Sequence, residues 1–371
     1  MSADSIASLV ARALHHGAAG MEKGDPAVPP IVPASVYYLP GEATGPYQYG
    51  RWSNPTWSAL EAALSVLEDA ETLVFPSGMA AIAAICYSQL RSGDRILLPA
   101  DGYYTTRAFA ERFLSPLGVA VELCPTASLD GQTFEGFRLV WIETPSNPGL
   151  DLCRIETVAA KARRAGALVV ADNTTATPLG QRPLELGVDA VMSSDTKTVG
   201  GHSDVLLGHV ASRNTALMAS LRDWRNLTGA IPGPFEAWLV HRGLESLELR
   251  YDRMCANAQR IAERLSKHKA IANVRYPGLA FDPAHAIAAA QMLRFGQLIG
   301  VTFASKTAAD RFIEEAAFIL PATSFGGVQT SAERRARWGD LVPEGFVRLS
   351  VGCEPLEALW AEMKRVLDRL A

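Results

Sequence analysis

The chain has 371 residues, of which 48% are hydrophobic and 20% are charged, and its formal net charge is −4. This composition supports a large folded core, and without a long block of like charge it gives no reason to expect a nucleic-acid partner. No stretch approaches about 18 uncharged apolar residues and the first residues lack a signal-peptide pattern, so we expect a cytoplasmic protein without a membrane span. The five cysteines are scattered and form no C-x-x-C pair, which disfavours a disulfide framework or a cysteine zinc site.

Residues 1–45 combine a predicted helix at Ser5–His15 with a stretch rich in proline and glycine. Such a stretch forms little core of its own, and a disordered tail is one interpretation. Its interspersed apolar residues, such as Ile31 and Val36, favour another, an arm that contacts a neighbouring subunit.

From residue 46 to about residue 235, short apolar segments alternate with helical patterns, which is typical of a parallel sheet covered by helices. The predicted helices are Asn54–Glu71, Met79–Leu90, Thr105–Leu114 and Glu156–Ala165. The predicted strands are Thr72–Phe75, Arg95–Leu98, Val119–Leu123, Leu139–Glu143, Leu168–Asp172, Ala190–Ser193 and Gly208–Ala211.

After Pro232-Gly233-Pro234 the pattern changes, and we expect a smaller α+β domain at 236–371 after a larger domain at 46–235. Its predicted elements are a long helix at Phe235–Leu265, a strand at Leu298–Phe303, a helix at Thr307–Ala316, a strand at Phe346–Val351 and a helix at Pro355–Leu370.

Ligands of open parallel sheets bind beyond the carboxyl ends of the strands. Ser77, Gly78 and Met79 join one predicted strand to a helix, so their backbone N–H groups and the positive helix end suit a phosphate. Taken alone this signal is weak, because small residues are common at tight strand–helix turns.

Lys197 lies in S-S-D-T-K-T-V-G-G, after another predicted strand. A lysine without its proton in such a crevice can act as a Schiff-base nucleophile, whereas an ordinary surface lysine is the alternative. Ser194 and Thr196 flank it and could bind the same phosphate. Asp172 ends the apolar strand L-V-V-A-D, where it either caps a helix or pairs with a protonated ring nitrogen.

Three further residues complete the pattern. Tyr103 could stack on a planar ring or belong to the core, and Asn147 ends another strand. Arg348 interrupts an apolar strand, so it needs either an internal acid or a substrate carboxylate. A phosphate seat, an acid for a ring nitrogen, an aromatic residue, a lysine and an arginine together indicate an amino-acid enzyme that uses pyridoxal 5′-phosphate (PLP).

The sequence also resembles the Cys/Met-metabolism PLP-dependent enzymes, the cystathionine γ-synthase, β-lyase and γ-lyase family. The resemblance covers nearly the whole chain and is carried by A-V-P-P-I-V-P-A-S-V-Y, Y-Q-Y-G-R-W-S-N-P-T, F-P-S-G-M-A-A, V-W-I-E-T-P-S-N-P, V-V-A-D-N-T, S-S-D-T-K-T-V-G-G-H-S-D-V, S-F-G-G-V-Q and V-R-L-S-V-G. It implies PLP fold type I, the aspartate-aminotransferase-like α/β fold, with a mostly parallel sheet in a large domain and a smaller C-terminal α+β domain. It also implies a homotetramer built as a dimer of catalytic dimers.

The resemblance further implies a role for each matching residue. Lys197 binds PLP and moves protons, and Tyr103 stacks on the ring and exchanges a proton with the substrate. The other residues expected to hold the cofactor are Asp172, Ser77, Gly78, Met79, Ser194 and Thr196, with Tyr49 and Arg51 from the neighbouring subunit. The residues expected to bind the substrate carboxylate are Asn147, Ser324 and Arg348.

The expected activity is a carbon–sulfur lyase that cleaves cystathionine or a similar thioether amino acid. A γ-replacement enzyme, either a cystathionine γ-synthase or an O-acylhomoserine sulfhydrylase, is the alternative, and a non-catalytic metabolite-binding or scaffold protein on this fold is a hypothesis of a different class. Gln329 stands where many γ-reacting members of the family have glutamate, and the segment 330–345 is shorter than in many members. Trp338 with Arg334, Arg335 and Arg337 either influences substrate choice or forms a solvated charged helix. A zinc site at His202 and Asp204, or at His15 and His16, lacks convincing ligand spacing, and we expect no metal.

Overall fold

The computed structural model describes residues 3–371. The chain divides into two compact units, and each of them joins segments that are distant in sequence. The first unit runs from the N-terminus to Arg91 and resumes at Asp189–Glu248, and the second comprises Ser92–Val188 and Leu249–Ala371. The expected domain division at residue 235 stays a prediction. Among the described residues, no helix has both the length and the apolar character required to span a bilayer.

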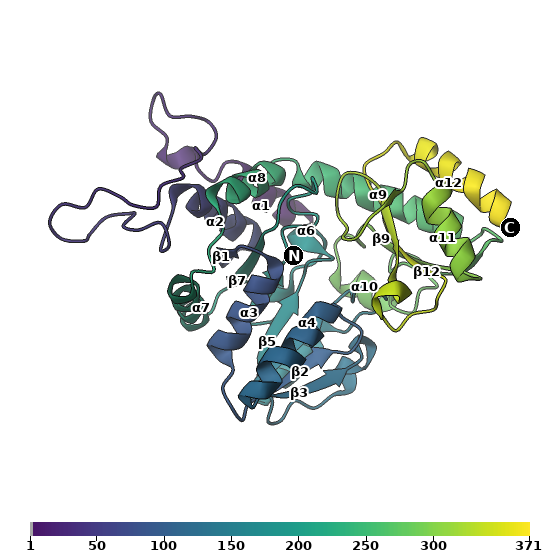
Figure 1. Cartoon of the computed structure of the whole chain (residues 1–371), viewed down its shortest axis with the longest axis horizontal. Coiled ribbons are helices and arrows are strands. Elements are labelled where there is room, and N and C mark those ends of the chain that lie inside the picture. Colours follow the sequence, from purple (N-terminus) through teal and green to yellow (C-terminus); the bar gives the residue numbers. More distant parts are fainter. Residues whose placement is uncertain (1–2) are drawn as a thin grey trace. The chain divides into compact units, whose positions relative to one another are not determined.

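The first unit carries three neighbouring strands in the order β1-β7-β6, and β7 runs antiparallel to both of its neighbours. These strands are β1 (Glu71–Phe75), β6 (Ala190–Ser193) and β7 (Gly208–Ser212). The helices of this unit are α1 (Ala3–Leu14), α2 (Pro55–Glu68), α3 (Gly78–Gln89), α7 (Thr215–Thr228) and α8 (Pro234–Leu244), with a 3₁₀ turn at Ala18–Gly20 (Figure 1).

Helix α2 begins where the sequence places a cap and a proline. The Asn54 side chain accepts a hydrogen bond from the Thr56 N–H at 2.8 Å, and Pro55 occupies the first helical position. Its apolar face, including Trp57 and Leu64, joins a core cluster that also contains Val199. The segment that follows Lys197 is therefore packed against the interior of this unit.

The first part of the second unit is a parallel sheet in the order β5-β4-β2-β3. The strands are β2 (Arg95–Pro99), β3 (Ala120–Cys124), β4 (Leu139–Glu143) and β5 (Leu168–Asp172). Its helices and helical turns are α4 (Tyr104–Phe109), a π turn at Ala110–Leu114, 3₁₀ turns at Ser115–Leu117, Thr126–Gly131 and Pro183–Leu186, α5 (Ile155–Arg164) and α6 (Thr177–Gly180). Because Glu143 pairs in register with Asp172, two carboxyl groups end neighbouring strands at one edge.

The second part of this unit is a smaller, mainly antiparallel sheet in the order β10-β11-β12-β9-β8. Its strands are β8 (Ile271–Arg275), β9 (Leu298–Phe303), β10 (Leu320–Pro321), β11 (Ser331–Arg334) and β12 (Phe346–Ser350). The helices are α9 (Leu247–Leu265), α10 (His285–Gln291), α11 (Lys306–Glu315) and α12 (Leu356–Leu370), with a 3₁₀ turn at Arg335–Trp338. One face of this sheet and the apolar faces of α9, α11 and α12 share a single core. The predicted α/β class, with a mostly parallel sheet and a smaller α+β part, is confirmed.

Two predicted helices differ from the structure. The expected single helix at Phe235–Leu265 is divided into α8 and α9. The Ser246 N–H bonds to the Gly243 carbonyl three residues back, and its hydroxyl also points to that carbonyl, so the helical turn tightens and ends. The expected helix at Thr105–Leu114 changes to a π turn after Phe109. Helix α7 is absent from the predicted elements because its apolar face, which includes Leu217 and Leu221, alternates with many polar residues.

Candidate active site

The first unit brings three backbone segments together at the N-terminus of α3. The Ser77 hydroxyl caps this helix by accepting the Ala80 N–H at 3.1 Å. A Cβ added at Gly78 would lie 2.8 Å from the Ser194 Cβ, and one added at Gly208 would lie 2.7 Å from the Gly78 nitrogen. Only glycine permits this approach, and the result is a narrow cradle where N–H groups and serine hydroxyls converge at a positive helix end. Ser77, Gly78, Met79 and Ser194 are thus neighbours, in an arrangement that suits a phosphate.

Lys197 lies in a loop of successive tight turns. The Lys197 N–H bonds to the Ser194 carbonyl at 3.1 Å, and the Gly201 N–H bonds to the Lys197 carbonyl at 2.8 Å. Thr196 is tied to Leu207 through its backbone N–H and its hydroxyl. The His202 Nδ1 lies 2.7 Å from the Gly200 carbonyl oxygen, so this histidine supports the loop. Lys197 itself is partly buried.

Tyr49 and Arg51 occupy a different part of the first unit. Arg51 donates a hydrogen bond to the Asn226 carbonyl near the end of α7, and its guanidinium carbon lies 5.4 Å from the centre of the Tyr49 ring. The Tyr49 side chain is exposed and packs edge-on against Trp52. Their expected contact with a neighbouring subunit's phosphate site stays a prediction.

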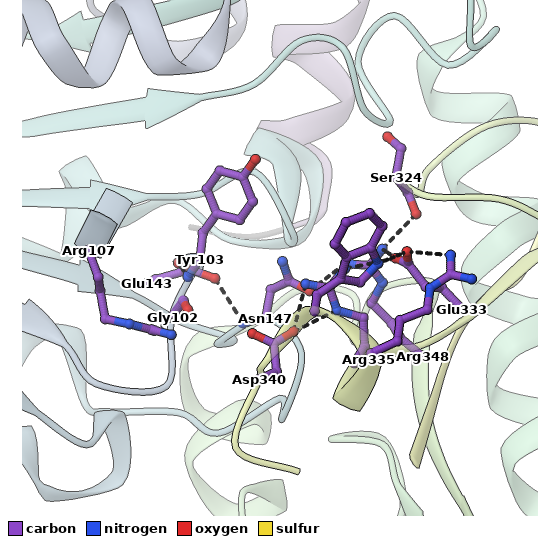
Figure 2. A network of polar contacts seen from close by, with 12 residues as sticks. Gly102, Tyr103, Arg107, Glu143, Asn147, Ser324, Glu333, Arg335, Asp340 and Arg348 are labelled. Atoms are coloured by element: carbon purple, nitrogen blue, oxygen red, sulfur yellow. Dashed lines mark hydrogen bonds and ion pairs between the residues drawn. The ribbon is translucent and has the colours of Figure 1, made fainter. Parts of the chain in front are cut away.

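In the second unit, Glu143 organises the residues expected near the ring of PLP, although the sequence interpretation assigned it no role. Its carboxylate accepts the Tyr103 N–H at 2.6 Å and the Asn147 N–H at 2.8 Å (Figure 2). A Cβ at Gly102 would lie 2.7 Å from the Glu143 Oε2, so the residue before Tyr103 must be glycine. The two backbone hydrogen bonds place Tyr103 and Asn147 on either side of one buried acid.

Asp172 is buried at the end of β5, and its carboxylate accepts the Thr174 N–H at 3.0 Å in a local turn. The nearby Glu143 has a pKa raised well above its usual value, first by burial and then by the charge of Asp172. Two adjacent buried acids favour a ligand that brings a proton or a positive charge to them. This chemistry fits the pyridine nitrogen of PLP.

Arg348 contacts the two other residues expected to bind a carboxylate. Its Nη1 donates to the Asn147 Oδ1 at 2.7 Å, and its Nη2 donates to the Ser324 carbonyl at 2.8 Å (Figure 2). Ser324 has a φ of 77°, a left-handed conformation that turns its carbonyl toward the arginine. Burial, followed by the charge of Arg335, lowers the Arg348 pKa to about 10, and its Nε has no hydrogen-bond partner within the described part of the chain.

A cluster of arginines surrounds Glu333, which is buried and lies opposite Arg348 across β11 and β12. Its carboxylate accepts hydrogen bonds from Arg335 at 2.8 Å, Arg337 at 3.0 Å and Arg348 at 3.0 Å. The Trp338 indole N–H donates to the same carboxylate, and Arg335 also pairs with Asp340 at 2.6 Å. Burial raises the pKa of Glu333, but the hydrogen bond from Arg335 and the charge of Arg348 outweigh burial and hold it below its usual value. We name these residues, Glu333, Arg335, Arg337, Trp338, Asp340 and Arg348, the arginine cluster.

The alternative of a solvated charged helix at Arg334–Arg337 is therefore wrong for its first two arginines, which are both buried. Arg334 points to the other face of β11 and pairs with Asp310 and Glu344, because neighbouring side chains alternate along a strand. Gln329 is exposed. Sequence signals could not identify Glu333, since a charged run looks the same whether or not its acid is buried.

The comparisons with known proteins identify the family. The family model described as Cys/Met metabolism PLP-dependent enzyme matches residues 11–368. The chain is 50% identical over 366 residues to a putative cystathionine gamma-lyase of Streptomyces coelicolor, with 96% of this chain and 93% of the relative covered. It is 36% identical to the cystathionine beta-lyase of Lactococcus lactis subsp. cremoris, with 95% and 97% covered.

Its structure superimposes on that of cystathionine gamma synthase from Xanthomonas oryzae pv. oryzae, in complex with cystathionine, with a TM-score of 0.93, 32% identity and 98% of each chain covered. The predicted PLP fold type I is thereby confirmed, and the glycine cradle and the paired acids fit the cofactor that this family uses. The chain thus belongs to the Cys/Met metabolism PLP-dependent enzymes, which act on cystathionine and related sulfur amino acids and depend on pyridoxal 5′-phosphate.

Proposed function

We propose that this enzyme is a carbon–sulfur lyase that cleaves cystathionine or a similar thioether amino acid. The observation that carries the proposal is the position of Arg348, which donates to the Asn147 side chain, while the backbone N–H groups of Asn147 and Tyr103 both donate to Glu143 (Figure 2). A substrate carboxylate bound at Arg348 is thereby held at a set position relative to Tyr103. Orientation of this kind is what an elimination requires, because the bond to be broken must be aligned.

The residues that the family resemblance assigns to the cofactor would hold it. Ser77, Gly78, Met79, Ser194 and Thr196 would bind its phosphate, Asp172 would bind its ring nitrogen, Tyr103 would cover its ring and Lys197 would bind it covalently. When bound, PLP accepts the electron pair released at the substrate Cα. The Lys197 amine removes the Cα proton, and for a leaving group at Cγ it also removes one from Cβ. The Tyr103 hydroxyl exchanges a proton with the substrate amine or the leaving sulfur.

A product assay tests the activity. The purified protein loaded with PLP is given cystathionine, and the products are separated by chromatography. Pyruvate with homocysteine would show β-elimination, and 2-oxobutyrate with cysteine would show γ-elimination. The competing function is γ-replacement, which is supported by the similarity to the Xanthomonas synthase. Absence of any keto acid from cystathionine, with cystathionine formed instead from an O-acylhomoserine and cysteine, would overturn the lyase proposal.

We further propose that the enzyme works in the cytoplasm as a homotetramer of catalytic dimers, with 1–45 as an arm on the neighbouring subunit and with domains at 46–235 and 236–371. The arm exposes large apolar side chains, such as Val36 at 72% and Tyr38 at 91%, and such surface is usually covered in an assembly. The cysteines of the described chain are all free, which fits a reducing compartment.

Mixed subunits test whether the active site is shared. Lys197→Ala and Arg51→Ala proteins would each be inactive, whereas refolding them together should restore about a quarter of the sites, because one site of each hybrid dimer is intact. If the mixture stays inactive while sedimentation shows hybrid dimers, Arg51 does not serve the neighbouring subunit.

A further inference from the structure

A buried group of charged side chains lies beside the loop that carries Lys197. His209 on β7 contacts two acids, with its Nδ1 2.7 Å from the Asp195 Oδ1 and its Nε2 3.3 Å from the Glu68 Oε1. None of the three side chains is more than 3% exposed. We name Glu68, Asp195 and His209 the histidine cluster. All three belong to the first unit, and Asp195 stands two residues before Lys197.

The surroundings make this cluster costly unless its members are paired. Every residue of β7 is buried, and a charge in such a place is tolerated only with a partner. Burial lowers the His209 pKa, but the charge and hydrogen bond of Asp195, followed by Glu68, outweigh burial and raise it to about 10. His209 is therefore protonated at neutral pH, and both of its ring nitrogens act as donors.

Asp195 connects this cluster to the lysine loop. Its backbone carbonyl accepts the Gly200 N–H at 2.8 Å, so the two ends of the segment 195–200 are joined at this residue. A Cβ at Gly200 would lie 2.6 Å from the same carbonyl oxygen, which shows how closely the turn is folded. From the other side, a Cβ at Gly243 of α8 would lie 2.5 Å from the Gly200 carbonyl oxygen. Asp195 therefore lies at the start of the turn 195–200, and Gly200 at its other end packs closely against α8.

Stability alone gives little reason for a charged cluster at this place. Buried ion pairs can often be replaced by apolar residues without loss of stability, so their retention calls for another role. Unlike an apolar contact, the cluster fixes an orientation. His209 is bonded at both ring nitrogens, so it can hold Asp195 in only one orientation. One Asp195 oxygen, Oδ2, has no hydrogen-bond partner among the described residues. The acid is therefore held through its contact with His209.

We propose that the histidine cluster is a positioning device for the cofactor lysine: Glu68 orients His209, His209 orients Asp195, and Asp195 keeps the loop 194–201 in the conformation that presents Lys197 and the phosphate-binding residues. These three residues act through the loop and need not touch substrate. The link to PLP rests on the proposed role of Lys197, whereas the effect on the loop does not.

Hydrogen exchange in the PLP-free protein tests the device directly. In Asp195→Asn and His209→Gln proteins, the amides of Thr196, Lys197 and Gly200 should exchange at least about tenfold faster than in the wild type, while the β1–β7 ladder keeps its protection. The matched control is Ser212→Ala, which removes another buried polar side chain of β7, one that bonds to the Asp189 carbonyl. Unchanged exchange at these three amides in folded Asp195→Asn and His209→Gln proteins would overturn the proposal.

A double variant separates positioning from packing. In Asp195→Ala/His209→Leu the charges of Asp195 and His209 are removed together, and the buried Glu68 that loses its histidine can take up a proton, so we expect a folded protein even where single variants do not fold. The proposal expects fast exchange in its loop and a PLP dissociation constant, measured from cofactor absorbance, at least about tenfold above that of the wild type. If the double variant shows wild-type loop protection and wild-type PLP affinity, the cluster serves only to fill space. Fast loop exchange with unchanged PLP affinity would keep the loop device and argue against the proposed role of Lys197.

Discussion

The two charged clusters solve the problem of buried charge in different ways. In the histidine cluster no side chain is more than 3% exposed, and one imidazole lies between two carboxyl groups. In the arginine cluster three arginines face two carboxylates, the Arg337 side chain is 45% exposed, and Arg348 keeps its Nε without a partner in the described chain. The histidine cluster is closed to solvent, which suits the holding of a backbone segment in one conformation. The arginine cluster has an excess of positive charge and a buried Arg348 Nε–H that is not hydrogen-bonded within the described chain, which suits the binding of an anion.

The largest expected effect on the free energy of unfolding comes from breaking the histidine cluster. Asp195→Ala leaves a charged His209 buried with one acid, and loss of one partner of a buried pair typically costs about 3–5 kcal/mol. Urea unfolding of the PLP-free protein should show this loss in the free energy of unfolding. Arg213→Ala, which breaks the exposed pair with Asp69, is the control and should cost less than about 1 kcal/mol. Equal losses for the two variants would remove the distinction between closed and exposed pairs.

The closed cluster should also respond to high pH. Because the folded-state pKa of His209 is raised to about 10, above the usual value of 6.5, its contribution to stability is complete below pH 6.5 and declines as the pH rises through 10. The difference in unfolding free energy between wild type and His209→Gln should therefore shrink from pH 6.5 to pH 10. A difference that stays constant or widens over this range would show that His209 is neutral in the folded protein.

In the arginine cluster, we expect Arg348→Ala to lower kcat/KM by about a hundredfold or more, because the substrate carboxylate loses the guanidinium group that binds it. PLP content should stay that of the wild type. Arg334→Ala is the matched control, since this neighbouring arginine of β11 pairs with Asp310 and Glu344 on the opposite face. A similar loss of kcat/KM in both variants would point to damage of the sheet instead of a lost carboxylate site.

Glu333→Gln should raise KM by about tenfold while kcat changes less, because three arginines then repel one another and Arg348 is less well placed. Steady-state kinetics with cystathionine would measure the two constants. Glu344→Gln removes an exposed partner of Arg334 and serves as the control. An unchanged KM in Glu333→Gln would mean that Asn147 and Ser324 alone hold Arg348.

Trp338→Phe is expected to have the smallest effect. It keeps an aromatic ring beside Arg337 but removes the indole N–H that bonds to Glu333. Loss of one hydrogen bond to a carboxylate that keeps three other donors should raise KM by about threefold. A change of tenfold or more would instead indicate that the half-exposed indole contacts the substrate directly.

Much of the fold could be predicted from short-range patterns. The ends of β4 and β5 and the loop after β6 are visible because apolar runs stop at polar residues, and Asp172, Asn147 and Lys197 stand at those points. The roles of these residues remain proposals. The division between α8 and α9 is not visible in the sequence, because one serine that bonds three residues back does not interrupt the helical pattern.

The pairing of charges could not be predicted in the same way. Arg348 meets Asn147 across 201 positions, and His209 meets Glu68 across 141, so no local pattern announces either contact. Glu333 looks like a member of a solvated charged run, but strand alternation turns it toward Arg348 while Arg334 faces away.

The sequence by itself determined the class of fold, the family and the residues that end the strands. These depend on local periodicity and on short motifs that follow one another in a characteristic order. Only the tertiary structure decided which charged side chains are buried and how they pair. Burial is a property of contacts between distant segments, and the free energy of a buried charge depends on its partners far more than on its own identity.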